Sequence, residues 1–144
     1  MEGTVIIVAY NAEDCIGNCL TALRAVEDYS SIKVVVVDNA SADRGIEIVR
    51  EFFPEVTLIE SGSNGGFATG NNRGGQEAEG DWIFLLNPDA EIKPAALRIL
   101  ARYLREHPEA GIVAPAIIGS KDEPAVSFFC FTTPLYSVLS LIHI

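Results

Sequence analysis

Short apolar runs alternate with amphipathic segments along most of this chain. Four runs are rich in β-branched residues and have the length of buried strands, at residues 3–9, 32–38, 56–60 and 81–87. Between the runs, apolar residues recur at spacings of three and four, which predicts helices. Strands that alternate with helices form right-handed βαβ units. We therefore expect an α/β fold with a mostly parallel sheet and helices on both faces.

The predicted helices differ in the signals that begin and end them. Asn11 is a candidate N-cap of the first helix, with acidic residues in the first turn, and Ser41 is a candidate cap of the second. Pro54 marks the end of the second helix. The segment at residues 67–80 contains several glycines and is a poor helix by propensity.

The last predicted elements precede residue 119. Pro94 suits the first position of a helix at 94–107, whose expected buried stripe is Leu97, Leu100, Tyr103 and Leu104. The run at 111–118 predicts a fifth strand, in which Pro115 indicates an edge or a bulge. We expect one domain at residues 1–118, followed at 119–144 by a partial continuation that is truncated or non-native.

Polar segments follow each of the first four predicted strands. They are Tyr10-Asn11, Asp38 to Ser41, Ser63 to Gly66 and Asn87 to Ala90. Parallel strands end at one edge of a sheet, and ligands bind outside that edge. Asn87-Pro88-Asp89 alone is typical of a plain turn, but its three polar neighbours favour a ligand site at this edge.

The charge and the missing motifs narrow the class of ligand. Ten basic and twenty acidic residues give a formal net charge of −10, which argues against a nucleic-acid polymer as partner. No dinucleotide-binding or Walker A glycine pattern is present, and His107 and His143 lie outside the four loops. Asp38 and Asp89 remain as carboxylates at the edge. A divalent ion that prefers oxygen ligands, shared with ligand phosphates, fits such a site.

Four segments in order resemble the motifs of the family 2 glycosyltransferases with the GT-A fold, a Rossmann-like nucleotide-diphospho-sugar-binding fold. They are VIIVAYNAED, VVVVDNAS.D, SNGGFATGNNRG and FLLNPDA, and they are most similar to the rhamnosyltransferase-like branch. The resemblance covers residues 3–118. It implies an inverting glycosyl transfer in polysaccharide biosynthesis. The donor would be a sugar linked to UDP or dTDP, and the acceptor would be a carbohydrate or a lipid-linked molecule.

The resemblance also implies a set of substrate-binding residues. Those expected to contact the base and ribose are Tyr10, Asn11, Asp38 and Asn39. Those expected near the nucleotide and its diphosphate are Asn64, Gly65, Gly66 and Asn72. The D-x-D-like motif reads Asn87-Pro88-Asp89, so only its last acid is present, and Asp89 is the expected ligand of Mg²⁺ or Mn²⁺.

Alternative interpretations of these residues stay open at this point. Asp38 could merely cap the following helix or turn, and Gly65-Gly66 could be a plain turn. Trp82 is interpreted as a packing residue. For the whole chain, a nucleotide-binding module without transfer activity and a nucleotidyltransferase-like domain are the alternatives.

The family takes its catalytic base from a second half, which does not follow residue 118 here. We therefore expect the 144-residue chain to be the donor-binding half and to be inactive alone. The amino terminus lacks the basic region of a signal peptide, so a cytoplasmic location is expected, and peripheral membrane association of the full-length enzyme is left open. Cys15 and Cys19 are interpreted as small buried hydrophobes, not a redox pair.

Overall fold

The structure is a computed structural model that describes residues 2–119 and 123–125. The chain divides into two units after Gly111, and each is described by itself. The first unit alternates strands and helices, as the apolar pattern predicts. Its elements are β1 (Gly3–Ala9), α1 (Ile16–Arg24), a 3-10 turn η1 (Tyr29–Ser31), β2 (Ile32–Asp38), α2 (Gly45–Phe52), β3 (Thr57–Glu60), α3 (Gly66–Gln76), β4 (Trp82–Leu86) and α4 (Ala96–Glu106).

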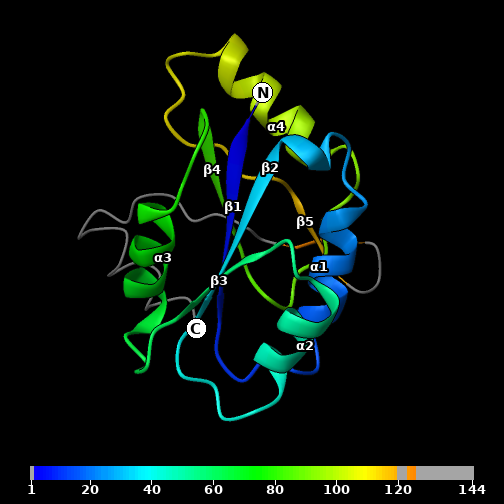
Figure 1. Cartoon of the computed structure of the whole chain (residues 1–144). Helices are drawn as coiled ribbons and strands as arrows, with labels where there is room; N and C mark the ends of the chain where they lie inside the picture. The colour runs from blue at the N-terminus through cyan, green and yellow to red at the C-terminus, as the bar shows by residue number, and fades with distance from the viewer. Residues whose placement is uncertain (1, 120–122, 126–144) are drawn as a thin grey trace, which may run out of the picture. The chain divides into compact units, whose positions relative to one another are not determined.

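The four strands form one parallel sheet in the order β3-β2-β1-β4 (Figure 1). Ile7 of β1 aligns with Val36 of β2 on one side and with Leu86 of β4 on the other. All seven residues of β1 are buried. The continuous apolar runs of the sequence are therefore explained by a central strand that is covered on both faces, and the predicted fold class is confirmed.

Successive residues of each strand pack against different layers of helix. Val5 and Ile7 belong to the larger core, together with Leu20 and Leu23 of α1 and Leu97 of α4. The opposite face carries a smaller cluster of Ile6, Val35 and Val37. Figure 1 shows α3 on one side of the sheet and α1 and α2 on the other. The second face is thus covered by α3, and Ile83 and Leu85 of β4 stay 53% and 49% exposed.

Helix α3 forms in spite of its glycines because two of them face the sheet. A Cβ atom at Gly70 would lie 2.7 Å from Cγ1 of Val8, and one at Gly74 would lie 2.5 Å from Cγ2 of Ile6. Residues four apart share one helix face, so these glycines let the helix backbone approach β1 closely. Tertiary packing therefore overrides the poor helix propensity of the segment.

Both predicted N-caps are wrong. Helix α1 begins at Ile16 after Cys15, and α2 begins at Gly45 after Arg44. The side chains of Asn11 and Ser41 bond to each other's loops instead of to helix ends. The predicted stripe of α4 is also wrong in part, because Tyr103 is 46% exposed and stacks on His107 with ring centroids 4.2 Å apart.

The predicted fifth strand is wrong in extent and in pairing. In the second unit, β5 covers only Ile117–Ile118, and it pairs antiparallel with β6 (Pro124–Ala125) in a separate two-stranded sheet. Pro115 lacks the N–H group that a longer ladder needs. Within residues 2–119 and 123–125, no helix has the length and apolar character that crossing a bilayer requires.

Adjacent glycines of α3 give a matched test of the close helix-sheet contact. Gly74→Ala should lower the free energy of unfolding by about 1–3 kcal/mol, because the added methyl group overpacks the contact with Ile6. A Cβ at Gly75 meets no atom within 4 Å, so Gly75→Ala should raise the free energy of unfolding by about 0.5–1 kcal/mol. Urea denaturation measures both, and equal effects would contradict the packing explanation.

Candidate functional site

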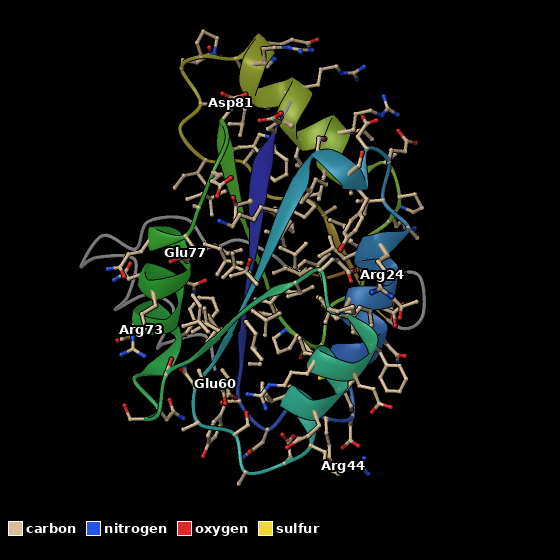
Figure 2. All side chains as sticks on the ribbon, viewed as in Figure 1. Arg24, Arg44, Glu60, Arg73, Glu77 and Asp81 are labelled. Atoms are coloured by element: carbon tan, nitrogen blue, oxygen red, sulfur yellow. The ribbon has the colours of Figure 1, made fainter. Side chains whose placement is uncertain are left out.

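The polar loops that follow the four strands lie at one edge of the sheet. Because β2 and β4 both run parallel to β1, the carboxyl ends of all these strands point the same way. In Figure 2, Arg44 and Glu60 mark this end of the first unit and Asp81 marks the opposite end. Asp38 ends β2, and Asn87 follows β4. Two strand spacings separate β2 from β4, which places their ends roughly 10 Å apart.

Asn11 joins the loop after β1 to the loop after β2. Its N–H donates to Oγ of Ser41 at 3.0 Å, and its Oδ1 accepts from the N–H of Ala42 at 2.9 Å. The backbone of Asn11 is left-handed, with φ of 49°, a conformation that asparagine tolerates better than most residues. Asn11 is therefore a brace between two loops, and its neighbour Tyr10 is 53% exposed beside it.

A second pair of bonds joins the same two loops. The N–H of Glu13 donates to Oδ2 of Asp43 at 2.8 Å, and the N–H of Arg44 donates to Oε2 of Glu13 at 2.8 Å. The sequence interpretation gave neither Glu13 nor Asp43 this role, because the acids after Asn11 were assigned to the first turn of a helix and Asp43 was assigned no role. The signal that could have found them is the occurrence of similar polar segments, NAED and NASAD, after two neighbouring strands.

Asp38 is a nearly buried carboxylate at the end of β2. It is 5% exposed, and its two oxygens accept from the N–H of Ser41 at 3.1 and 3.3 Å. Among the described residues, no cation lies within ion-pair distance of it. A carboxylate has about four acceptor positions, so Asp38 keeps capacity for a further donor. Ala40, between Asp38 and Ser41, has a left-handed φ of 62° and shapes this turn.

Asn39 connects the sheet to the glycine-rich loop. Its side chain is buried, and Nδ2 donates to the carbonyl oxygen of Gly66 at 3.1 Å. Its own N–H donates to the carbonyl oxygen of Ala9 at 2.9 Å. Asn39 thus holds the start of α3 against the ends of β1 and β2, and its predicted contact with substrate remains a prediction.

The glycine-rich loop makes a tight turn into α3. Oδ1 of Asn64 accepts from the N–H of Gly66 at 2.9 Å, and Gly66 has a φ of 80°, which favours glycine. Gly65 is the N-cap residue and has no side chain to accept from the first turn. A helix start of this kind offers N–H groups to an anion. Asn72 is exposed and lies six residues into α3, about 9 Å along its axis, so the structure does not bring it to the loops.

The segment after β4 is a turn that leaves its acid free in solvent. The N–H of Ala90 donates to the carbonyl oxygen of Asn87 at 3.1 Å, with Pro88 inside the turn. Asn87 and Asp89 are exposed, and within the described part of the chain no hydrogen bond or ion pair engages the carboxylate of Asp89. Turn and ligand interpretations are therefore compatible, because the turn presents an unpaired carboxylate at the ligand edge.

The cysteines of α1 pack behind this turn. Sγ of Cys19 donates to the carbonyl oxygen of Asn87 at 3.6 Å, and both Cys15 and Cys19 are free thiols. Burial, followed by the nearby Cys15, Asp89 and Glu91, raises the pKa of Cys19 to about 12. Burial and the nearby Asp89 also raise the pKa of Cys15. Protonated thiols are poor nucleophiles, so these cysteines act as small packing residues. Cys130 lies outside the described residues.

The acidic residues at this edge would repel a phosphate ligand unless a cation offsets their charge. They are Glu13, Asp38, Asp43 and Asp89, and Arg44 is a basic residue among them. No group of three or more His, Cys, Asp or Glu side chains gathers as a metal cage in residues 2–119 and 123–125. The oxygens of Asp89 and Asn87 suit a hard divalent cation, but ligand oxygens must complete its coordination. The residues present therefore fit an ion that is shared with a diphosphate.

Residues 4–127 match the sequence profile of one protein family, described as glycosyl transferase family 2. The chain is 31% identical over 113 residues to the poly(ribitol-phosphate) beta-N-acetylglucosaminyltransferase TarS of Staphylococcus aureus, covering 74% of this chain and 19% of the relative. It is 26% identical over 124 residues to an N-acetylglucosaminyl-diphospho-decaprenol L-rhamnosyltransferase of Mycobacterium tuberculosis, covering 78% of this chain and 40% of the relative. The aligned part is thus less than half of each relative.

Solved structures agree with the fold and with the sequence matches. TarS residues 1–349, in complex with UDP-GlcNAc, superpose with a TM-score of 0.66 and 30% identity, covering 74% of this chain and 32% of that one. The mannosyltransferase PcManGT of Pyrobaculum calidifontis, in complex with GDP-Man and Mn²⁺, gives a TM-score of 0.66 and 29% identity, covering 72% of this chain and 33% of that one.

Proposed function

Because the chain belongs to glycosyl transferase family 2, we propose that residues 1–118 bind the nucleotide-diphosphate sugar donor of an inverting glycosyl transfer. The observation that carries the proposal is the joined set of loops at the carboxyl edge, with Asp38 buried and incompletely hydrogen-bonded inside it. The complex of TarS with UDP-GlcNAc supports a nucleotide sugar as the ligand class. A cytoplasmic location, where nucleotide sugars are made available, is part of this proposal.

The nucleoside lies over the loops after β1 and β2 in this proposal. Tyr10 is exposed and offers an aromatic face to the base. Asp38 accepts a hydrogen bond from the base or the ribose, which supplies the donor that its carboxylate lacks. Asn11 fixes the distance between the two loops through its bonds to Ser41 and Ala42, so the nucleoside meets a site that is formed before binding.

The diphosphate lies between the start of α3 and the turn after β4. Backbone N–H groups of the first turn of α3 are favourable partners for its oxygens. Asn87 and Asp89 would hold a divalent cation that shares phosphate oxygens, and the Mn²⁺ complex of PcManGT supports that cofactor class. Such an ion supplies positive charge that stabilises the leaving diphosphate.

In the transfer, an acceptor hydroxyl attacks the anomeric carbon of the donor sugar from the side opposite the diphosphate. The new bond joins the acceptor oxygen to that carbon, the bond from the carbon to the diphosphate oxygen breaks, and the hydroxyl proton passes to a base. The two relatives described above act on a poly(ribitol-phosphate) and on a diphospho-decaprenol. A carbohydrate or lipid-linked acceptor, of the kind used in polysaccharide biosynthesis, is therefore the proposed class here.

Removal of the Asp38 charge tests the nucleoside contact. Asp38→Asn keeps an oxygen for the N–H of Ser41 but should weaken UDP or dTDP binding by about 1–3 kcal/mol, the loss expected for a hydrogen bond to a charged group. Isothermal titration calorimetry measures this. Asp81→Asn makes the same charge change at the opposite end of β4 and is the matched control. Equal affinity in wild type and Asp38→Asn would reject the assignment.

Asp89 is tested by the metal dependence of binding. Mg²⁺ or Mn²⁺ should tighten nucleotide-diphosphate binding to the wild type, and Asp89→Asn should abolish that gain without loss of stability, since its side chain is exposed. Titrations with and without EDTA measure the difference. The turn interpretation returns if the wild type binds equally well in both conditions.

The 144-residue chain alone should bind the donor without transferring its sugar. A base must come within about 3 Å of the acceptor oxygen. Of the acids beyond the turn that carries Asp89, Glu106 lies 3.9 Å from Arg102 and Glu109 contacts His107, at the carboxyl end of α4. A coupled assay with several nucleotide sugars and simple acceptors checks turnover. Sustained metal-dependent transfer would contradict this prediction, and Glu123→Gln, with the neighbouring Asp122→Asn, would then locate the base.

A further inference from the structure

Two residues of the polar loops have a backbone conformation that is unfavourable for any residue with a Cβ atom. Asn11 has a φ of 49°, and Ala40 has a φ of 62°. Such left-handed residues persist only where the surrounding contacts hold them, and they are concentrated at functional sites. Ala40 has no polar side-chain atom of its own. Contacts made by its neighbours must therefore keep the loop after β2 in shape.

The loop after β2 is held by carboxylates at both of its ends. At its start, Asp38 accepts from the N–H of Ser41. At its end, Oδ1 of Asp43 accepts from the N–H of Gly45 at 3.1 Å, and Oδ2 accepts from the N–H of Glu13 at 2.8 Å. Asp43 thus joins the first residue of α2 to the segment after β1.

Glu13 makes the reciprocal bond. Its Oε2 accepts from the N–H of Arg44 at 2.8 Å, while its own N–H donates to Asp43. Each segment therefore supplies one N–H and one carboxylate to the other, and we call these two bonds the Glu13–Asp43 bridge. Hydrogen bonds with a charged acceptor are stronger than those between neutral groups. The bridge thus adds substantially to the bonds that Asn11 makes with the same loop.

The bridge joins two backbones that are already in close contact. Gly45 is buried, and a Cβ atom there would lie 3.2 Å from Oδ1 of Asp43 and 3.3 Å from the backbone nitrogen of Glu13. Because these separations are tighter than ordinary contacts, only glycine lets α2 begin directly against the segment after β1 without a shift. The bridge therefore fixes one separation of the two loops, with no space for a closer one.

We propose that Glu13 and Asp43 are positioning residues for the nucleoside, through the bridge that they form. The bridge holds the loop after β2 in its left-handed turn at Ala40, which keeps Ser41 bonded to Asp38. Both carboxylates of the bridge accept from backbone N–H groups, so their role does not require contact with the ligand. This inference rests on the proposed function, in which the nucleoside lies over these two loops.

Loss of the bridge would let the loop leave its binding conformation. The apparent dissociation constant then rises in inverse proportion to the fraction of molecules that stay competent to bind. The charge of Glu13 has the opposite effect, because a carboxylate at this acidic edge repels the anionic diphosphate. Positioning therefore predicts weaker binding when the Glu13 side chain is removed, whereas charge alone predicts tighter binding.

Two substitutions of Glu13 separate these effects. Glu13→Ala removes both the charge and the acceptor for the N–H of Arg44, and should weaken UDP or dTDP binding about fivefold or more. Glu13→Gln removes the same charge but keeps an oxygen for that N–H, so its affinity should stay within about twofold of the wild type or increase. Isothermal titration calorimetry measures both affinities. Glu13 is exposed, and circular dichroism checks that the variants are folded.

Asp43 gives a second, coupled test. Asp43→Ala removes the other carboxylate of the bridge and should also weaken nucleotide binding. In the double variant with Glu13→Ala, the loss should be smaller than the product of the two single losses, because both side chains act through one bridge. Single losses that multiply in the double variant would contradict the joint role of the two acids.

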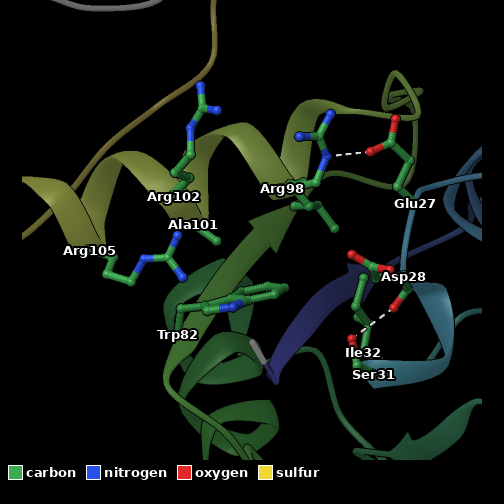
Figure 3. Close-up of a pocket in the computed structure, with 10 residues that line it drawn as sticks. Glu27, Asp28, Ser31, Ile32, Trp82, Arg98, Ala101, Arg102 and Arg105 are labelled. Carbon is green, nitrogen blue, oxygen red and sulfur yellow. Dashed lines mark hydrogen bonds and ion pairs between the residues drawn. The ribbon is translucent and has the colours of Figure 1, made fainter.

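Glu27 provides a matched control at the opposite end of the sheet. Its carboxylate pairs with Arg98 of α4 and so also links two segments, beside an open cavity (Figure 3). The seven residues of β1 separate this end from the polar loops by roughly 20 Å. Because that separation exceeds the range of screened charges, Glu27→Ala should leave the nucleotide affinity within about twofold of the wild type.

The outcomes also separate the positioning role from the proposed function. If the wild type binds neither UDP nor dTDP, both are overturned. If the wild type binds and Glu13→Ala binds as tightly or more tightly, only the positioning role is overturned. It is likewise overturned if Glu13→Gln or Glu27→Ala loses as much affinity as Glu13→Ala.

Discussion

Parallel hydrogen bonding of β1 to a strand on each side fixes the geometry of the candidate site. The register aligns Ala9 with Asp38 across one ladder and Ile7 with Leu86 across the other. Since β1 is buried on both faces, a slip of one residue would exchange its two sets of side chains between unlike layers. Core packing therefore sets how far along the strand direction Asp38 and the turn that carries Asp89 lie. The bonds between the polar loops have only a secondary effect on these positions.

The positions of strands and helices could be predicted because burial on both faces leaves a simple signal, a run of β-branched residues between amphipathic segments. Three features of the fold could not be predicted from the sequence. Helix α3 depends on how closely Gly70 and Gly74 approach β1, which propensity does not express. Asn11 and Ser41 have the chemistry of helix caps but bond across loops. The run at 111–118 is apolar enough for a strand, yet only Ile117–Ile118 finds a partner.

Some features of the candidate site could likewise be predicted from the sequence, and others could not. Asp38 and Asp89 could be placed at one edge from the sequence, because each follows an apolar run and parallel strands end together. The bonds that join the loops link residues about thirty positions apart, such as Asn11 with Ser41 and Glu13 with Asp43, and no local pattern predicts them. Trp82 was interpreted as a packing residue, which its contact with Gly3 bears out, but no sequence pattern predicts that its buried N–H finds no partner among the described residues.

Strand β4 is an edge strand of the four-stranded sheet, so a further strand can pair with it. Among the described residues it pairs only with β1, and its outer backbone N–H and C=O groups, with Ile83 and Leu85 beside them, form an edge that can template another strand. A strand that joins in parallel would bring its own carboxyl-terminal loop next to Asp89, whereas an antiparallel strand would bring its amino-terminal end there. The orientation of whatever strand docks on β4 thus decides which chemical groups lie next to the turn that carries Asp89.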